Sequence, residues 1–227
     1  MTDTPNRRPL KSRSAAWARV LAARLAIAGA NPNLISAASI AFAAFGGAML
    51  VWAGASRLAL LRAGLFVLVA IAIQLRLLCN LLDGMVAVEH GRGSAAGPIW
   101  NELPDRFADL ILLAAAGYAV SSSGVRGGAA IGWLCAALAI LTAYIRELGR
   151  SLGFPADFSG PMAKPHRMAA LTLACLGSAL EPLWGWRGAA LMLGLVLIAL
   201  GAALTVARRT RTLALRLAAR AEEGGTR

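Results

Sequence analysis

The sequence predicts an all-α integral membrane protein with six transmembrane helices, preceded by an N-terminal amphipathic helix on the membrane surface. Hydrophobic residues make up 58% of the 227 residues and charged residues only 15%, whereas a soluble domain carries about 25% charged residues. Six apolar stretches approach the roughly 20 residues that a spanning helix needs. Lys and Arg gather between these stretches and at both ends of the chain, which is typical of multi-pass membrane proteins.

The N-terminal segment, residues 1–30, is predicted to be a basic cytoplasmic arm with a helix that lies in the membrane interface. Apolar side chains recur in it at roughly helical spacing, between basic residues. The apolar ones are Trp17, Val20, Leu21 and Leu25, and the basic ones are Arg7, Arg8, Lys11, Arg13, Arg19 and Arg24. A cleaved signal peptide is the competing interpretation, but Arg19 and Arg24 interrupt the apolar core that such a peptide needs.

The six predicted spans fill one domain, residues 31–208. They are approximately Asn33–Ala53, Ala63–Leu82, Phe107–Ser123, Gly127–Leu148, Arg167–Leu183 and Gly188–Ala207. The third and fifth are short in apolar residues. The third can be extended backwards to Pro98 if its polar turns face the interior of a helix bundle. The basic tail, residues 209–227, is expected to continue the sixth helix out of the bilayer and to anchor it.

The connections between the spans differ in charge, and this difference predicts the topology. Taken together, both ends of the chain and the second and fourth connections carry more Lys and Arg than the other three connections together. The positive-inside rule places the richer segments in the cytoplasm, so we expect a bacterial inner-membrane protein. The net charge of +12 favours anionic lipids and phosphate-bearing substrates. Nucleic acid is excluded because the basic residues are not interleaved with stacking aromatics.

Polar residues interrupt the second and third spans at helical spacing. The segment Asn80-Leu-Leu-Asp83-Gly84-Met-Val-Ala87-Val88 is followed by Gly97, Asn101 and Asp105. In helices, Asn80, Asp83 and Ala87 share one face, and Asn101, Asp105 and Asp109 share another. Ionisable groups at membrane depth are costly, so they indicate a functional site.

Two such faces, rich in oxygen ligands and joined by a glycine-containing loop, can close around a hard cation such as Mg²⁺ or Mn²⁺. The alternative is that the aspartates have only a structural role and form ion pairs with Arg76, Arg92 or Arg106. A proton-coupled or ion-coupled transporter would also place carboxylates at this depth, but the sequence has no internal repeat and no paired broken helices.

The register resembles the signature of the CDP-alcohol phosphatidyltransferases, D-x-x-D-G-x-x-A-R, eight residues, then G-x-x-x-D-x-x-x-D. The matching residues are Asp83, Gly84, Ala87, Gly97 and Asp105, and the departures are Asn80, Val88 and Asn101. The resemblance implies six transmembrane helices and a homodimer. It also implies transfer of a phosphatidyl group from a CDP-linked donor such as CDP-diacylglycerol to a small alcohol acceptor, with release of CMP.

The resemblance also implies roles for the residues that match. Asp83 would hold the metal, Gly84 and Ala87 would line the nucleotide pocket together with Gly97, and Asp105 would be the general base with a share in metal binding. Asn80 and Asn101 stand where aspartates are expected, so the metal would be held more weakly or one ion would bind instead of two. Arg92 could replace the arginine that is absent at Val88. The set Asp83, Asp105 and Asp109 is an alternative metal site, and Pro104 would kink the helix before the base.

A second basic cluster lies on the same predicted side of the membrane. Arg146, Lys164 and Arg167 are candidates for binding the acceptor or phosphate groups, because Arg offers a bidentate fork and Lys a point charge. Arg150 is read equally well as a flanking charge. The leading hypothesis is thus a phosphatidyltransferase of phospholipid synthesis. The alternatives are a catalytically impaired relative that binds lipid or nucleotide, and an unrelated small transporter.

Overall fold

The computed structural model describes residues 15–89, 91 and 95–225. In these ranges the regular structure is entirely helical. The helices are α1 (Ala16–Ile27), α2 (Pro32–Ala55), α3 (Ala59–Glu89), α4 (Gly97–Ser122), α5 (Gly128–Ser151), α6 (Lys164–Leu180), the short 3₁₀ helix η2 (Glu181–Trp184) and α7 (Ala189–Gly225). Helices α2 to α7 correspond one to one with the six predicted apolar stretches, so the predicted all-α fold is confirmed.

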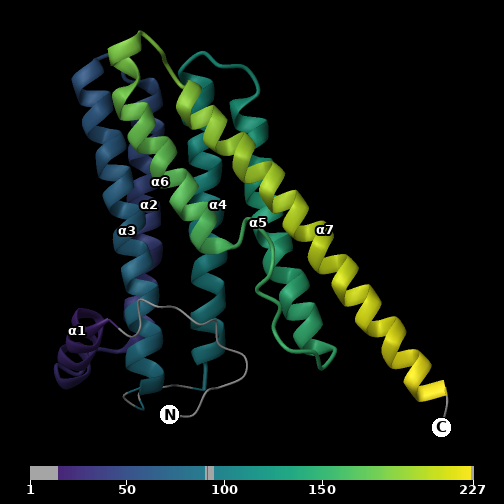
Figure 1. Cartoon of the computed structure of the whole chain (residues 1–227). Helices are drawn as coiled ribbons and strands as arrows, with labels where there is room; N and C mark the ends of the chain where they lie inside the picture. Colours follow the sequence, from purple (N-terminus) through teal and green to yellow (C-terminus); the bar gives the residue numbers. More distant parts are fainter. Residues whose placement is uncertain (1–14, 90, 92–94, 226–227) are drawn as a thin grey trace.

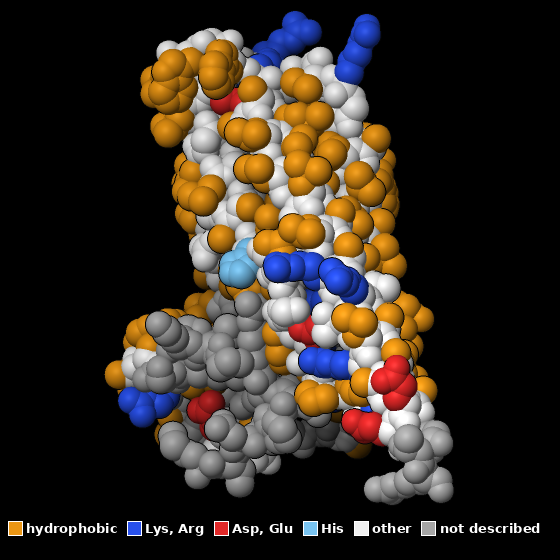
Figure 2. Space-filling view, turned by 45° about the vertical axis from the view of Figure 1, so that its right-hand side comes forward, with side chains coloured by type: hydrophobic (Ala, Val, Ile, Leu, Met, Phe, Trp, Pro, Cys, Tyr) orange, Lys and Arg blue, Asp and Glu red, His pale blue; other side chains and the backbone are white. Residues whose placement is uncertain are grey.

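Four of these helices are long and apolar enough to cross a membrane: Pro32–Ala55, Ala59–Glu89, Gly128–Ser151 and the Ala189–Glu223 part of α7. The other two, α4 and α6, are the stretches that are short in apolar residues. Helix α6 has 17 residues, and the first half of α4 carries the charged part of the motif. Figure 2 shows hydrophobic side chains over much of one face of the bundle, while charged side chains gather toward its lower part. These features fit an integral membrane protein.

Helices α2 to α6 form an upright bundle, and α7 crosses it at a slant and continues beyond it (Figure 1). Small residues bring the helix backbones together, as is common in membrane bundles. A Cβ added at Gly117 of α4 would lie 2.5 Å from the carbonyl oxygen of Gly128 of α5, and one added at Gly54 of α2 would lie 2.5 Å from Ala119 of α4. These contacts leave no room for a side chain and hold α4 between α2 and α5.

The first helix, α1, lies beside the lower end of α3 in Figure 1. Its alanine face, built from Ala18, Ala22 and Ala26, packs against a cluster that includes Met85 and Val86 of α3. Trp17 and Val20 remain exposed, at 56% and 52%. The predicted arginines and lysine before residue 15 lie outside the described residues.

Two sequence predictions about helix ends are confirmed. Helix α4 begins at Gly97 and runs through Pro104, so the helix of the third apolar stretch does begin at the polar turns around Pro98. Helix α7 continues to Gly225, so the basic tail is a continuation of the sixth helix. Both extensions lie at the lower end of the bundle in Figure 1, which we call the site end.

The opposite end of the bundle, which we call the distal end, is closed by a buried ion pair. The carboxylate of Glu181 in η2 lies 3.1 Å from Arg62 Nη2 in α3, and both side chains are at most 4% exposed. Glu181 also accepts hydrogen bonds of 2.7 Å from the backbone N–H groups of Gly188 and Ala190 at the start of α7. Arg187 donates to the carbonyl oxygens of Gly54 and Ser56, so the connections at this end are tied to one another.

Candidate active site

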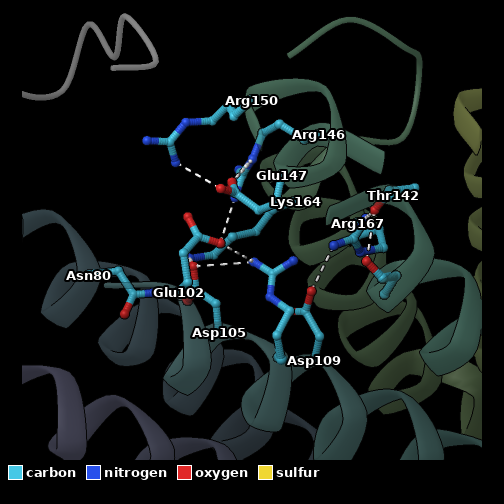
Figure 3. A network of polar contacts seen from close by, with 12 residues as sticks. Asn80, Glu102, Asp105, Asp109, Thr142, Arg146, Glu147, Arg150, Lys164 and Arg167 are labelled. Atoms are coloured by element: carbon cyan, nitrogen blue, oxygen red, sulfur yellow. Dashed lines mark hydrogen bonds and ion pairs between the residues drawn. The ribbon is translucent and has the colours of Figure 1, made fainter. Parts of the chain in front are cut away.

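The motif residues lie at the site end, where α3, α4, α5 and α6 meet. Asn80 and Asp83 come from the last turns of α3, and Asp105 and Asp109 come from the first half of α4. Lys164 and Arg167 lie in the first turn of α6. The residue before this helix, Ala163, has an extended backbone conformation, and Pro165 also lies in the first turn. Figure 3 shows most of these side chains pointing toward one another. The site is therefore assembled from residues up to 87 positions apart in the chain, from Asn80 to Arg167.

The floor of the site is a buried triad of Arg76, Asp109 and Arg167. The two oxygens of Asp109 lie 2.9 Å from Arg76 Nη2 and 2.7 Å from Arg167 Nη2, and all three side chains are at most 1% exposed. Arg167 also donates to Thr142 Oγ1 at 3.2 Å and to the Met162 carbonyl oxygen at 3.1 Å. Both oxygens of Asp109, a metal ligand in the alternative prediction, thus already pair with an arginine.

Above the floor, Asp105 is the centre of a more open cluster. Its Oδ1 accepts a 2.6 Å hydrogen bond from Asn80 Nδ2 and lies 3.4 Å from Arg76 Nη2. Its Oδ2 forms an ion pair with Lys164 and lies 3.8 Å from Arg106 Nη2. The Asp105, Lys164 and Arg106 side chains are 13%, 22% and 20% exposed, so a ligand can reach this cluster.

Asp83 has a different environment from Asp105. Its carboxylate accepts a 2.5 Å hydrogen bond from Ser36 of α2, and the residue is 6% exposed. Asp83 and Asp105 carry like charges on α3 and α4, so a cation held by both carboxylates would offset their repulsion. Neither Ser36 nor its role was predicted from the sequence.

The oxygen donors of the site are of the kind that a hard divalent cation prefers, but few of them are negatively charged. Asp83 and Asp105 supply carboxylates, Asn80 supplies a carboxamide, and Asn101 is exposed on the same helix as Asp105. In the described part of the chain, no three His, Cys, Asp or Glu side chains group in a way that could hold a metal. The predicted set of Asp83, Asp105 and Asp109 is therefore not assembled.

The remaining residues predicted to bind substrate lie at the end of α3 and at the start of α4. Gly84 and Ala87 are half-buried on α3, and Gly97 is half-buried at the start of α4. Val88, at the position of the missing arginine, is 56% exposed. Arg92, the predicted replacement, lies outside the described residues.

The rim of the site is a row of paired charges on α4 and α5. Arg146 lies 2.5 Å from Glu102 Oε2 and 2.8 Å from Glu147 Oε1, and its guanidinium is 5.6 Å from the centre of the Phe158 ring. Arg150 pairs with Glu147 at 2.7 Å and is 42% exposed. Arg146 thus joins the site through Glu102 (Figure 3), whereas Arg150 sits at its edge.

Sequence reasoning gave Arg76 only the role of a structural partner, yet it touches both Asp105 and Asp109. A signal was available, because Arg76 is a lone arginine inside an apolar stretch, four residues before Asn80 on the same helical face. Thr142 gave no such signal. Its hydroxyl matters only because Arg167 folds back against it.

Neither a protein-family model nor a curated protein sequence matches the chain. Solved structures do match it, among them three of Mycobacterium tuberculosis phosphatidylinositol phosphate synthase (PgsA1). The structure with CDP-DAG bound has a TM-score of 0.72 and 20% sequence identity, covering 88% of this chain and 94% of that one. The complex with manganese and citrate has a TM-score of 0.70 and 20% identity, covering 86% and 88%. The apo form has a TM-score of 0.67 and 19% identity, covering 85% and 94%.

The chain therefore has the same fold as this phosphatidylinositol phosphate synthase. The similar solved structures reported above are all of this synthase. The similarity extends over most of both chains.

Proposed function

We propose that this chain is a CDP-alcohol phosphatidyltransferase that moves a phosphatidyl group from CDP-diacylglycerol, or a similar CDP-linked donor, to a small alcohol. In the transfer, the acceptor oxygen forms a bond to the donor phosphorus, the bond from phosphorus to CMP breaks, and the hydroxyl proton goes to a base. The supporting observation is that the motif residues Asp83 and Asp105 lie on neighbouring helices of a fold shared with a synthase that binds CDP-DAG.

The divalent metal of the proposed reaction is Mg²⁺ or Mn²⁺, and one neighbouring structure contains manganese. When bound, the ion supplies charge neutralisation for the diphosphate and orients the displacement. The carboxylates of Asp83 and Asp105 balance the charge of one divalent ion, which supports a single-ion site.

Asp105 is the proposed general base, because its carboxylate is the accessible one and Asp109 is sealed below it. The Lys164 ammonium, which contacts Asp105, lies at the N-terminus of α6. Helix N-terminal N–H groups favour anions, so Lys164 and this helix end together would bind phosphate. Gly84, Ala87 and Gly97 would line the nucleotide pocket, and Arg146 and Arg167 would set the charge of its walls.

The second candidate is a catalytically impaired member of the fold that binds lipid or nucleotide. Two observations favour it: Asn80 donates its carboxamide hydrogen to Asp105 instead of supplying a charge, and Lys164 covers the other oxygen of Asp105. A small transporter is less well supported, because the shared fold is that of a synthase.

The deciding experiment uses the full chain in liposomes that contain CDP-diacylglycerol, with Mg²⁺ or Mn²⁺ present. A panel of acceptors (glycerol 3-phosphate, inositol phosphate, serine) is tested by measuring CMP release. We expect metal-dependent release with one acceptor. Metal-dependent donor binding without CMP release from any acceptor would favour the impaired member, and absence of both would reject the whole assignment.

We further propose that the chain spans the membrane six times as a homodimer in a bacterial inner membrane, with both ends and the site end in the cytoplasm. Residue 122 ends α4 at the distal end, whereas residue 159 lies in the connection between α5 and α6 at the site end. Cysteines placed at Ser122 and Ser159 should therefore be labelled from opposite sides of the membrane. Labelling of both from one side would contradict the topology. The basic residues after Arg208 would contact anionic lipids.

A further inference from the structure

The part of α7 that continues beyond the bundle holds the connection between α5 and α6, residues 152–163. Near the end of that connection, Thr205 Oγ1 accepts a 3.0 Å hydrogen bond from the Met162 backbone N–H. A Cβ added at Gly160, which has φ +108°, would lie 2.5 Å from Thr205 Cγ2. At its start, Arg220 donates to the Leu152 carbonyl oxygen at 2.8 Å and lies 3.9 Å from the centre of the Phe154 ring. The tail that the sequence assigned to anchoring is thus part of the support of this connection.

Arg209 is the buried member of this contact. It is 5% exposed, although it lies on a helix whose neighbouring arginines, Arg208 and Arg211, are exposed. Its Nε donates to the Ser159 carbonyl oxygen at 2.9 Å, and its Nη1 donates to the Thr142 carbonyl oxygen at 2.6 Å. One guanidinium therefore fixes the connection and α5 together.

Asp157 adds an electrostatic contact to the same region. Partial burial alone would raise the pKa of Asp157, but hydrogen bonds from Ser159 and the charges of Arg209 and Arg216 outweigh that effect and lower the pKa. The carboxylate therefore remains ionised beside these arginines near neutral pH.

From Thr142 the contacts lead directly to the floor of the site. The residue is 3% exposed, and its Oγ1, which donates to the Ala139 carbonyl oxygen, accepts from Arg167 Nη1 at 3.2 Å. Arg167 in turn pairs with Asp109, and Asp109 pairs with Arg76, which reaches Asp105. A continuous series of hydrogen bonds and ion pairs thus joins Arg209 to the proposed base.

We infer that Arg209 is a positioning residue: it holds the α5–α6 connection and Thr142 so that Lys164 and Arg167 enter the site in the observed arrangement. Its guanidinium is occupied by two carbonyl oxygens, so it acts on the site through other residues instead of contacting substrate. The kinetic part of this inference rests on the proposed transferase function, whereas its structural part does not.

The test compares Arg209→Met and Arg209→Lys with Arg211→Met, a matched control on the same helix, in the full chain in lipid. Amide hydrogen exchange of residues 157–164 measures the support of the connection. We expect faster exchange in Arg209→Met, an intermediate rate in Arg209→Lys because one ammonium cannot reproduce the guanidinium fork, and the parental rate in Arg211→Met.

Turnover gives the second measurement. Displacement of supporting groups can cost up to about a hundredfold in rate, so kcat should fall in Arg209→Met while the KM for the acceptor changes little. Unchanged exchange, or a rise in acceptor KM without a loss of kcat, would overturn the inference, and the latter result would make Arg209 a substrate contact. Failure of both Arg209 variants to fold would also overturn it. If the parent itself releases no CMP, the proposed function fails, and the exchange data still decide the structural part.

Discussion

The two ends of α3 carry ionic clusters of similar composition that differ in completeness. At the distal end, Glu181 receives hydrogen bonds from Arg62 and from two backbone N–H groups, and both charged side chains are at most 4% exposed. At the site end, only the floor triad around Asp109 is sealed to this degree. Asp105, directly above it, is 13% exposed and is surrounded by half-buried cations.

This difference separates a structural cluster from a cluster that can bind a ligand. A buried charge that is fully paired contributes to the arrangement of the helices, and removal of one partner is costly. A charge at an accessible surface can exchange its partners for a ligand at a lower cost. The site end contains both kinds, and four tests would break or sharpen this comparison.

The largest effect is expected at Asp105. Loss of a general base costs about two to four powers of ten in rate, so Asp105→Asn should abolish measurable CMP release while largely sparing donor binding. Asp83→Asn should weaken metal-dependent donor binding as well. CMP release and binding of labelled CDP-diacylglycerol check these outcomes. Turnover of Asp105→Asn within a few-fold of the parent would reject Asp105 as the base.

Asp109→Asn should mainly affect folding. It leaves Arg76 and Arg167 buried without their shared anion, and breaking a buried pair costs about 3–5 kcal/mol. Thermal unfolding in detergent should show a large loss of stability, whereas Asp105→Asn should show a small one. Equal losses in the two variants would contradict the division of the site end into a sealed floor and an open cluster.

Glu181→Gln tests the distal cluster by itself. The amide has one acceptor oxygen, so it can accept from Gly188 or from Ala190 but not from both, as the two carboxylate oxygens do. It also no longer neutralises Arg62, so we expect a loss of about 1–3 kcal/mol in stability. The folded fraction should retain the parental kcat, because the cluster lies at the opposite end of α3 (Figure 1). A lower kcat in correctly folded protein would show that the two ends are coupled.

The smallest effect is expected from restoring charge at Asn80 and Asn101. The double substitution Asn80→Asp and Asn101→Asp adds two carboxylates near Asp83 and Asp105, so it should lower the Mg²⁺ or Mn²⁺ concentration for half-maximal donor binding. Ser122→Asp, at the exposed distal end of α4, is a control that adds charge away from the motif. An unchanged or higher metal requirement in the double variant would show that Asn80 and Asn101 do not stand at ligand positions.

Much of the fold could be predicted from the sequence, because apolar length and charge placement act locally. The six apolar stretches, the backward extension of α4 and the helical tail all follow from such local signals. The number of membrane-spanning helices is harder to predict from apolar length. Polar turns shorten the apolar part of α4, and α6 has only 17 residues.

The site could be predicted in part, since the motif gives Asp83 and Asp105 but not their partners. Ser36 lies 47 positions from Asp83, and Arg167 lies 58 positions from Asp109. Pairings of this kind depend on how the helices pack, which the spacing of residues within one helix does not encode. For the same reason, Asp109 fitted a ligand role by its spacing and only the packing shows its pairing with two arginines.

The floor triad also bears on how the chain enters the membrane. Asp109 and Arg76 arrive with α3 and α4, but Arg167 and Lys164 arrive with α6, which is synthesised later. Until α6 is in place, the aspartates of the earlier hairpin lack half of their counterions in a medium where each charge costs roughly 3 kcal/mol. The late, short helix α6 therefore carries the charges that the earlier hairpin needs, so the floor triad can be completed only after the whole of α5 and the start of α6 have been synthesised.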